Sequence, residues 1–294
     1  MNSITRSNWL LLRIVAIFAC SLCAFPSLAT AQGSQGQNAV FNSSGNCSQC
    51  IGSSAFIDAF ITQGQHDDFC STIYNIIHQT AYPAGGAVID ARGISARLTC
   101  ASGTSPWLES TGYVNKPSTI LLPAATIGIS YPWVLPNGTK LIGQGTTGED
   151  DIVNGVALPT TIQNSGSITS GAMIQFGDST NCPSGTCSNI AVEHLTVDGN
   201  NQSVTGILNE NAGSGSYVQH VTLYRVWGTG LWLTANSGGG SASNSGPYTN
   251  INYDTGSSAL STSICANING LTGTNGIRQL SCVSSFETQQ ARWR

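Results

Sequence analysis

Short apolar runs recur along most of the chain, and polar turn residues separate them. From Gly85 onward each run spans three to nine residues, and clusters of Gly, Asn, Ser and Pro divide one run from the next. Runs of this length bounded by turn formers are typical of β-strands. The pattern predicts strands over Ala87–Asp90, Thr119–Leu122, Lys140–Ile142, Thr160–Gln163, Met173–Phe176, Ile190–Val197, Val218–Val226 and Leu231–Leu233.

One segment before these strands has a helical period. Apolar residues recur at three- and four-residue spacing over 69–77, and Asp67 or Asp68 precedes them as an N-cap. Pro83 follows, so we expect a short helix over about 68–80. Because no further helical pattern separates the strands, a doubly wound α/β sheet is excluded, and a β-sandwich or a parallel β-solenoid remains.

Internal repeats decide between these two folds. Val192–Val197 and Val218–Leu223 share the pattern V-x-H-apolar-T-apolar at an offset of 26 residues. We interpret Tyr248–Tyr253, 30 residues later, as a third copy and Ile268–Thr272 as a partial fourth. A period of 20–30 residues carrying two or three short strands is typical of a parallel β-helix.

A second motif interleaves with the first. We align Thr205-Gly206-Ile207, Thr229-Gly230-Leu231 and Asn275-Gly276-Ile277 as its copies. Stacked coils would bury a continuous apolar column, because no coil can bury its apolar residues alone.

The repeats also predict which side chains face the core. Val192, Leu195 and Val197 are expected to point inward, and Glu193 and Thr196 outward. His194, His220 and Asn250 take equivalent positions in the three copies, and we expect a polar ladder at one corner.

The first 31 residues resemble a secretory signal. Arg6 and Arg13 precede an apolar run over Ile14–Phe25, and Ala29-Thr30-Ala31 provides a cleavage site. That run is too short for a membrane span, so we expect a secreted protein without a membrane anchor after cleavage.

Three parts of the chain follow from this pattern. We predict a signal peptide over 1–31, a low-complexity linker or N-terminal extension over 32–66, and a β-helix domain over 67–294. The last residues, Glu287–Arg294, are polar and lack a capping pattern, so we expect the solenoid to be incomplete at this end.

Composition excludes several classes of function. Charged residues make up only 8 % of the chain and the net charge is −4, so a basic nucleic-acid footprint is not expected. The sequence has no P-loop, dinucleotide-binding, serine-esterase or zincin motif. We expect a monomer that requires no cofactor.

Cysteine usage supports export. Cleavage after residue 31 would leave eight cysteines, and an even number in an exported chain indicates disulfides. The spacing does not determine the connectivity, but it favours Cys182–Cys187, Cys265–Cys282 and Cys70–Cys100. Cys47-Ser-Gln-Cys50 also fits a redox or zinc motif, although no second pair of ligands follows it.

Two longer segments resemble the pectate-lyase-like superfamily of right-handed parallel β-helices, in particular secreted bacterial proteins related to glycoside hydrolase family 28. These segments are the helix and first strands within 67–145 and the coil Ser188–Asn200, and the resemblance covers about 67–285. It implies an all-β, right-handed parallel β-helix with a short N-terminal capping helix. It also implies a hydrolase or lyase acting on an acidic, pectin-like polysaccharide.

The chain departs from the catalytic motifs of family 28. Asp198 follows Thr196-Val197 rather than Asn-Thr, the Asp150-Asp151 pair precedes it, and the His-Gly and Arg-x-Lys motifs are missing. The alternative is therefore a non-catalytic β-solenoid, acting as an adhesin or a carbohydrate-binding scaffold.

Candidate acids and metal ligands lie in three places. Asp198 and Asp178 are the candidate catalytic carboxylates, because glycoside hydrolysis needs two; Asp198-Gly199 is also a turn sequence. Glu149, Asp150 and Asp151 form an acidic run that can bind Ca²⁺ or remain a solvated loop.

Aromatic and basic residues suggest where a sugar would bind. Arg225, Tyr224, Trp227 and Trp232 are the candidate substrate-binding residues, because aromatic faces stack on sugar rings and a guanidinium pairs with a uronate. Both tryptophans fit core positions equally well. His194 and His220 can bind a metal or shuttle a proton, although the ladder explains both without chemistry.

Overall fold

A computed structural model provides the structure of the chain. It describes residues 55–64, 67–146, 159–179, 181–182, 186–235, 244–256, 262–269 and 276–283. All of these belong to the second of two units, 38–294, into which the chain divides. The predicted signal peptide, Cys47 and Cys50 lie outside the described residues.

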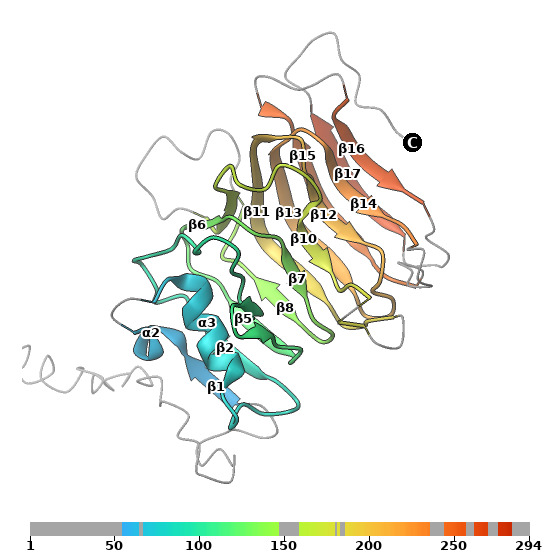
Figure 1. Ribbon diagram of the computed structural model, residues 1–294. Helices are drawn as coiled ribbons and strands as arrows, with labels where there is room; N and C mark the ends of the chain where they lie inside the picture. The colour runs from blue at the N-terminus through green and yellow to red at the C-terminus, as the bar shows by residue number, and fades with distance from the viewer. Residues whose placement is uncertain are drawn as a thin grey trace, which may run out of the picture. The chain divides into compact units, whose positions relative to one another are not determined.

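The described strands form two parallel sheets and a hairpin (Figure 1). The larger sheet follows the order β1 (Ala55–Asp58), β2 (Ala87–Asp90), β5 (Ser118–Leu121), β8 (Lys140–Ile142), β11 (Ala191–Gln202), β13 (Tyr217–Val226), β15 (Tyr248–Asp254) and β17 (Ile277–Val283). Two further strands, β6 (Thr126–Ile129) and β9 (Thr161–Asn164), join it through the second half of β11.

The second sheet has five strands. Its order is β7 (Trp133–Leu135), β10 (Ala172–Phe176), β12 (Thr205–Asn209), β14 (Thr229–Leu233) and β16 (Ile264–Ile268). The hairpin joins β3 (Leu108–Glu109) to β4 (Gly112–Tyr113). From β10 to β17 the chain visits the two sheets alternately, which is compatible with an all-β parallel solenoid.

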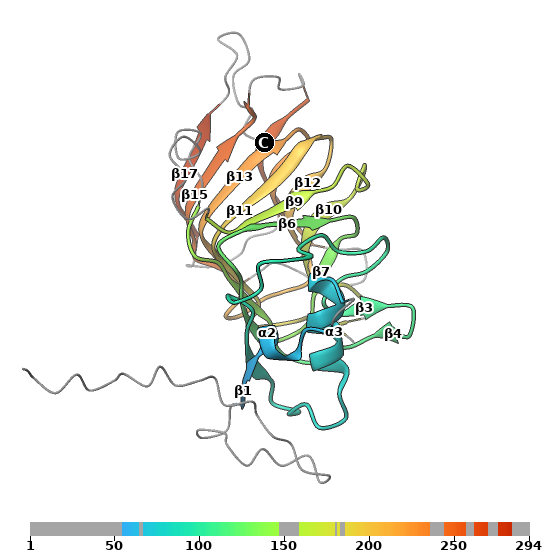
Figure 2. The same ribbon diagram turned by 90° about the vertical axis from the view of Figure 1, so that its left-hand side faces the viewer.

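The repeat register is confirmed for three copies. Val192 pairs with Val218 and Val218 with Tyr248, as the offsets of 26 and 30 predict, and Figure 2 shows the strands β11, β13, β15 and β17 side by side. The predicted fourth copy is wrong: Ile268 ends β16 in the other sheet, and the fourth copy is β17, in which Ile277 pairs with Tyr248. Ile277 therefore does not belong to the second motif.

Stacked aliphatic and aromatic side chains fill the core. The expected inward residues Val192, Leu195 and Val197 are completely buried. Thr196 is only 1 % exposed, although it alternates with them along the strand. It is in register with Thr161 and Thr222, so neighbouring threonines cover its side chain.

The predicted helix is present as α3 (Phe69–His78). Asp68 is its N-cap and accepts a hydrogen bond from the Ser71 amide at 2.9 Å. Phe69 stacks on Trp133 of β7, the end strand of the five-stranded sheet, and α3 lies beside β7 in Figure 2. The helix therefore packs against the end strand of the five-stranded sheet.

The sheet begins earlier than the sequence pattern predicts. β1 and the short helix α2 (Ala59–Thr62) lie within 32–66, which we expected to be a linker or extension. β1 pairs in register with β2, from Ala55 with Ala87 to Asp58 with Asp90. The four-residue run is too short and too isolated in polar sequence to stand out as a strand.

Three disulfides have the pairing that the spacing favoured. Cys70 bonds to Cys100, Cys182 to Cys187 and Cys265 to Cys282. No helix in the described residues has the length and apolarity that a membrane crossing requires. Both observations are compatible with a secreted protein.

Candidate functional site

Asp198 lies near the end of β11 and is held by several hydrogen bonds. Its carboxylate accepts hydrogen bonds from Gln163 Nε2 at 2.8 Å, from the Asn200 amide at 2.9 Å and from Arg225 Nε at 3.0 Å. Arg225 Nη2 also donates to it. The residue is only 3 % exposed. These donors, among them the Arg225 guanidinium, therefore compensate for the loss of water around the buried carboxylate.

Backbone geometry brings these groups together. Asp198 is in register with Gln163 of β9 and with Tyr224 of β13. A side chain at Gly199 would stand 2.6 Å from the Arg225 carbonyl oxygen, so glycine allows the two strands to approach here. Arg225 has a φ of 49°, and this left-handed bend turns its side chain back toward Asp198.

The guanidinium of Arg225 is shared between Asp198 and Tyr224. Its central carbon lies 5.0 Å from the centre of the Tyr224 ring, a cation–π contact. The hydrogen bond to Asp198 raises the pKa of Arg225. Both Nε and Nη2 donate to Asp198, so the edge that we expected to pair with a uronate faces a protein carboxylate.

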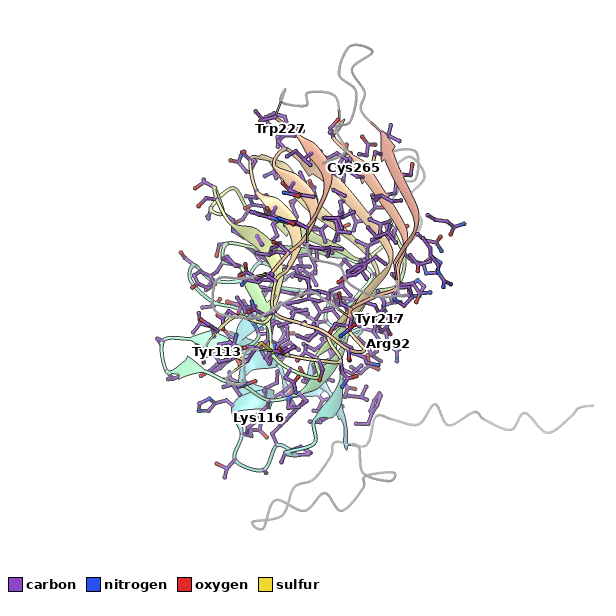
Figure 3. The ribbon with its side chains drawn as sticks, turned by 90° about the vertical axis from the view of Figure 1, so that its right-hand side faces the viewer. Arg92, Tyr113, Lys116, Tyr217, Trp227 and Cys265 are labelled. Carbon is purple, nitrogen blue, oxygen red and sulfur yellow. A yellow bond between two sulfur atoms is a disulfide. The ribbon has the colours of Figure 1, made fainter. Side chains whose placement is uncertain are left out.

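Trp227 follows the same strand as Tyr224 and Arg225, whereas Trp232 belongs to the other sheet. Trp227 follows β13, is partly exposed and donates from Nε1 to the Thr255 carbonyl at 3.2 Å. Figure 3 shows it near one end of the stack of strands. Trp232 belongs to β14 of the five-stranded sheet, in register with Leu208 and Asn267. The structure thus brings Arg225 and Tyr224 to Asp198, whereas the Trp227 backbone amide donates to the Gln202 carbonyl at 3.0 Å.

Asp178 occupies a different environment from Asp198. It follows β10 in the five-stranded sheet, and its Oδ1 accepts a hydrogen bond from the Asn181 amide at 2.8 Å. Burial raises the pKa of Tyr113, and the charge of Asp178 raises it further. Asp178 thus follows a strand of the five-stranded sheet, whereas Asp198 belongs to β11 of the larger sheet, and among the described residues no contact joins the two.

The expected calcium ligands Glu149, Asp150 and Asp151 lie outside the described residues. Within the part that the structure does describe, no group of three or more His, Cys, Asp or Glu side chains is arranged to hold a metal.

The histidines form the expected ladder. The His194 and His220 rings stack with centres 4.7 Å apart, and Asn250 Nδ2 lies 2.7 Å from His220 Nε2. These three residues have φ values of 51–53°, so the ladder marks a left-handed bend repeated in successive strands.

Two features escaped the sequence analysis. Tyr217 donates to Glu193 Oε1 at 2.6 Å, and burial together with this carboxylate raises the pKa of Tyr217 to about 12. A hollow of about 660 Å³ lies beside the ends of β1 and β2 and includes Asp58 and Asp90. The sequence Ile-Asp, which ends both strands, is a signal from which this pair could have been found.

Searches of protein-family models, curated proteins and solved structures find no match to this chain.

Proposed function

We propose that this chain is a secreted, right-handed parallel β-helix of the pectate-lyase-like kind that binds a polysaccharide without cleaving it at Asp198. The alternation of strands between two parallel sheets and the stacked ladder support the solenoid. The contact of Phe69 with Trp133 supports a capping role for α3, because an end strand must be covered.

The observation that carries the proposal is the complete hydrogen bonding of Asp198. A general acid, base or nucleophile must contact the substrate, but this carboxylate is 3 % exposed and already accepts from three side-chain N–H groups and one backbone amide. Tyr224, its register partner, and Trp227, three residues further along the chain, remain partly exposed. In this proposal Asp198 positions Arg225, Arg225 lies against the Tyr224 ring, and the two aromatic side chains supply a surface for a sugar ring.

Binding and cleavage are separated by two assays on the exported protein, purified with its disulfides formed. Affinity electrophoresis through a panel of plant and bacterial polysaccharides should show retardation by at least one of them. The same polysaccharides should release no new reducing ends, with Ca²⁺ or with EDTA. Tyr224→Ala should weaken retardation about 5–10-fold, the value of one aromatic contact.

Trp232→Ala is the matched control, because it removes an aromatic side chain from the other sheet. It should leave retardation unchanged while each variant still melts cooperatively. Absence of retardation by every polysaccharide would exclude the proposal. Release of reducing ends that requires Ca²⁺ would instead favour a lyase using Glu149–Asp151, and release in EDTA would favour a hydrolase with paired carboxylates.

A further inference from the structure

The hollow of about 660 Å³ lies where four neighbouring parallel strands come to an end. Its lining includes the last residues of β1 and β2, Asp58 and Asp90, together with Phe60 and Arg92, which follow them. Residues after β5 and β8 complete it, among them Pro123 and Gln144. Later strands such as β11 continue through the left-handed bend at His194. The first four strands of this sheet, β1, β2, β5 and β8, end at the height of this bend. The hollow lies beside their ends.

Asp58 provides a carboxylate oxygen that no described residue uses as an acceptor. Asp58 and Asp90 are register partners on adjacent strands, so their backbones are about 4.8 Å apart. Asp58 Oδ1 accepts from the Phe60 amide at 2.9 Å and caps α2. No described residue donates to its Oδ2, which therefore remains an available acceptor.

Asp90 is held as a carboxylate by a neighbouring arginine. Arg92 Nε and Nη2 donate to its two oxygens at 2.8 and 2.7 Å, and these hydrogen bonds lower the pKa of Asp90. Arg92 itself is 51 % exposed. The hollow therefore combines acceptors with a guanidinium whose orientation is already fixed by Asp90.

An aromatic ring is positioned at the same hollow. Phe60 is 56 % exposed, yet its Cβ lies 3.1 Å from where a Cβ at Gly93 would stand. The glycine thus lets Phe60 lie directly against the backbone after β2. A large apolar side chain that is exposed but packed in this way can stack on the apolar face of a sugar ring.

We infer that this hollow is a second carbohydrate subsite and that it takes an uncharged pyranose. Asp58 and Asp90 would accept hydrogen bonds from sugar hydroxyls, Arg92 would donate one, and Phe60 would stack on the ring. Two carboxylates and one guanidinium leave a net charge of −1, which disfavours a uronate. This inference rests on the proposed polysaccharide binding but places it at a different group of residues.

Titration calorimetry with uncharged hexasaccharides tests the subsite on the exported, disulfide-bonded protein. The probes are cellohexaose, mannohexaose and hexa-N-acetylchitohexaose, with hexagalacturonate as the charged comparison. At least one uncharged probe should bind more tightly than hexagalacturonate. Asp58→Asn keeps a capping oxygen for α2 but removes the charge, and it should raise the Kd of that probe at least 5-fold.

Phe60→Ala should raise the Kd by a similar factor. Phe56→Ala is its matched control, because Phe56 is 44 % exposed on β1 but does not line the hollow, and it should leave the Kd unchanged.

Two outcomes would overturn the inference, and they differ in what else they exclude. If Asp58→Asn and Phe60→Ala bind like the unmodified protein while Tyr224→Ala loses binding, the hollow is not a site and the proposed function stands. If none of the oligosaccharides and none of the polysaccharides binds, the proposed function fails together with the subsite.

Discussion

Four aspartates in the described residues make the same local turn, three at the end of a strand and Asp198 where the register of β11 shifts. One carboxylate oxygen accepts a hydrogen bond from the backbone amide two residues later, at 2.9 Å for Asp58, Asp198 and Asp254 and 3.1 Å for Asp90. This turn is a structural reason for aspartate at these positions. These aspartates differ in their other contacts: an arginine binds Asp90 and Asp198, whereas no described residue donates to Oδ2 of Asp58.

The pair between Asp198 and Arg225 is the first test at the residue scale. Arg225→Met should lower the free energy of unfolding by about 2–3 kcal/mol, because it leaves a buried carboxylate without its cation. The value is below that of a fully buried pair, since the Arg225 side chain is 28 % exposed. Asp198→Asn should also lower stability, by less, because the guanidinium that remains reaches solvent.

Urea unfolding of both variants and of the double variant Asp198→Asn/Arg225→Met measures the coupling between the two residues. The double variant should be more stable than Arg225→Met alone. Unchanged stability in both single variants, together with lost polysaccharide cleavage in Asp198→Asn, would show instead that Asp198 is a catalytic residue.

At the scale of the element, one bend is repeated in each strand of the ladder. His194, His220, Asn250 and Gln279 are equivalent positions, and their φ values lie between 51° and 59°. Residues other than glycine adopt this region at a cost, and asparagine has the smallest cost among them. The side chains therefore stack at a corner that the backbone has already determined.

Substitutions at His220 distinguish two contributions to the free energy of unfolding, the strain of the left-handed bend and the contact between the stacked rings. His220→Asn should keep stability within about 1 kcal/mol, because asparagine favours the left-handed region and continues the ladder of Asn250. His220→Val should lose about 2–3 kcal/mol, because a β-branched residue is strained at positive φ. Thermal and urea unfolding measure both, and equal stability of the two variants would contradict a left-handed bend at this position.

On the scale of the whole molecule, each coil contacts mainly its neighbours in the stack. Cys70–Cys100 joins α3 to the segment after β2, and Cys265–Cys282 joins the two sheets at β16 and β17. The two disulfides thus lie near opposite ends of the strand order. In a stacked array, the loss of one such bond should affect its own end most.

Removal of each disulfide tests this local coupling. Cys70→Ala/Cys100→Ala should destabilise the protein by about 3–4 kcal/mol in the loop-entropy description, since 30 residues separate the two cysteines. Hydrogen exchange should show faster exchange in α3 and β2 than in β15. Cys265→Ala/Cys282→Ala should reverse that order. A uniform loss of protection in either variant would indicate a single cooperative unit rather than a stacked array.

Much of the architecture follows from the sequence by itself. The repeat at 26 and 30 residues predicted the register of β11, β13 and β15, since residues that stack on one another must repeat the same inward pattern. The predicted helix and the three favoured disulfides are also present. These features depend on residues that are close in sequence or that recur at a regular spacing, so the sequence alone is enough to predict them.

Only the tertiary structure decided what surrounds each polar residue. Arg225 lies 27 positions after Asp198, and nothing in the spacing shows that its side chain turns back to that carboxylate. Asp58 and Asp90 meet because β1 pairs with β2, although a short apolar run in polar sequence hid the first strand. The partners of a charge depend on strands distant in the sequence, so burial and pairing are properties of the fold and not of the pattern.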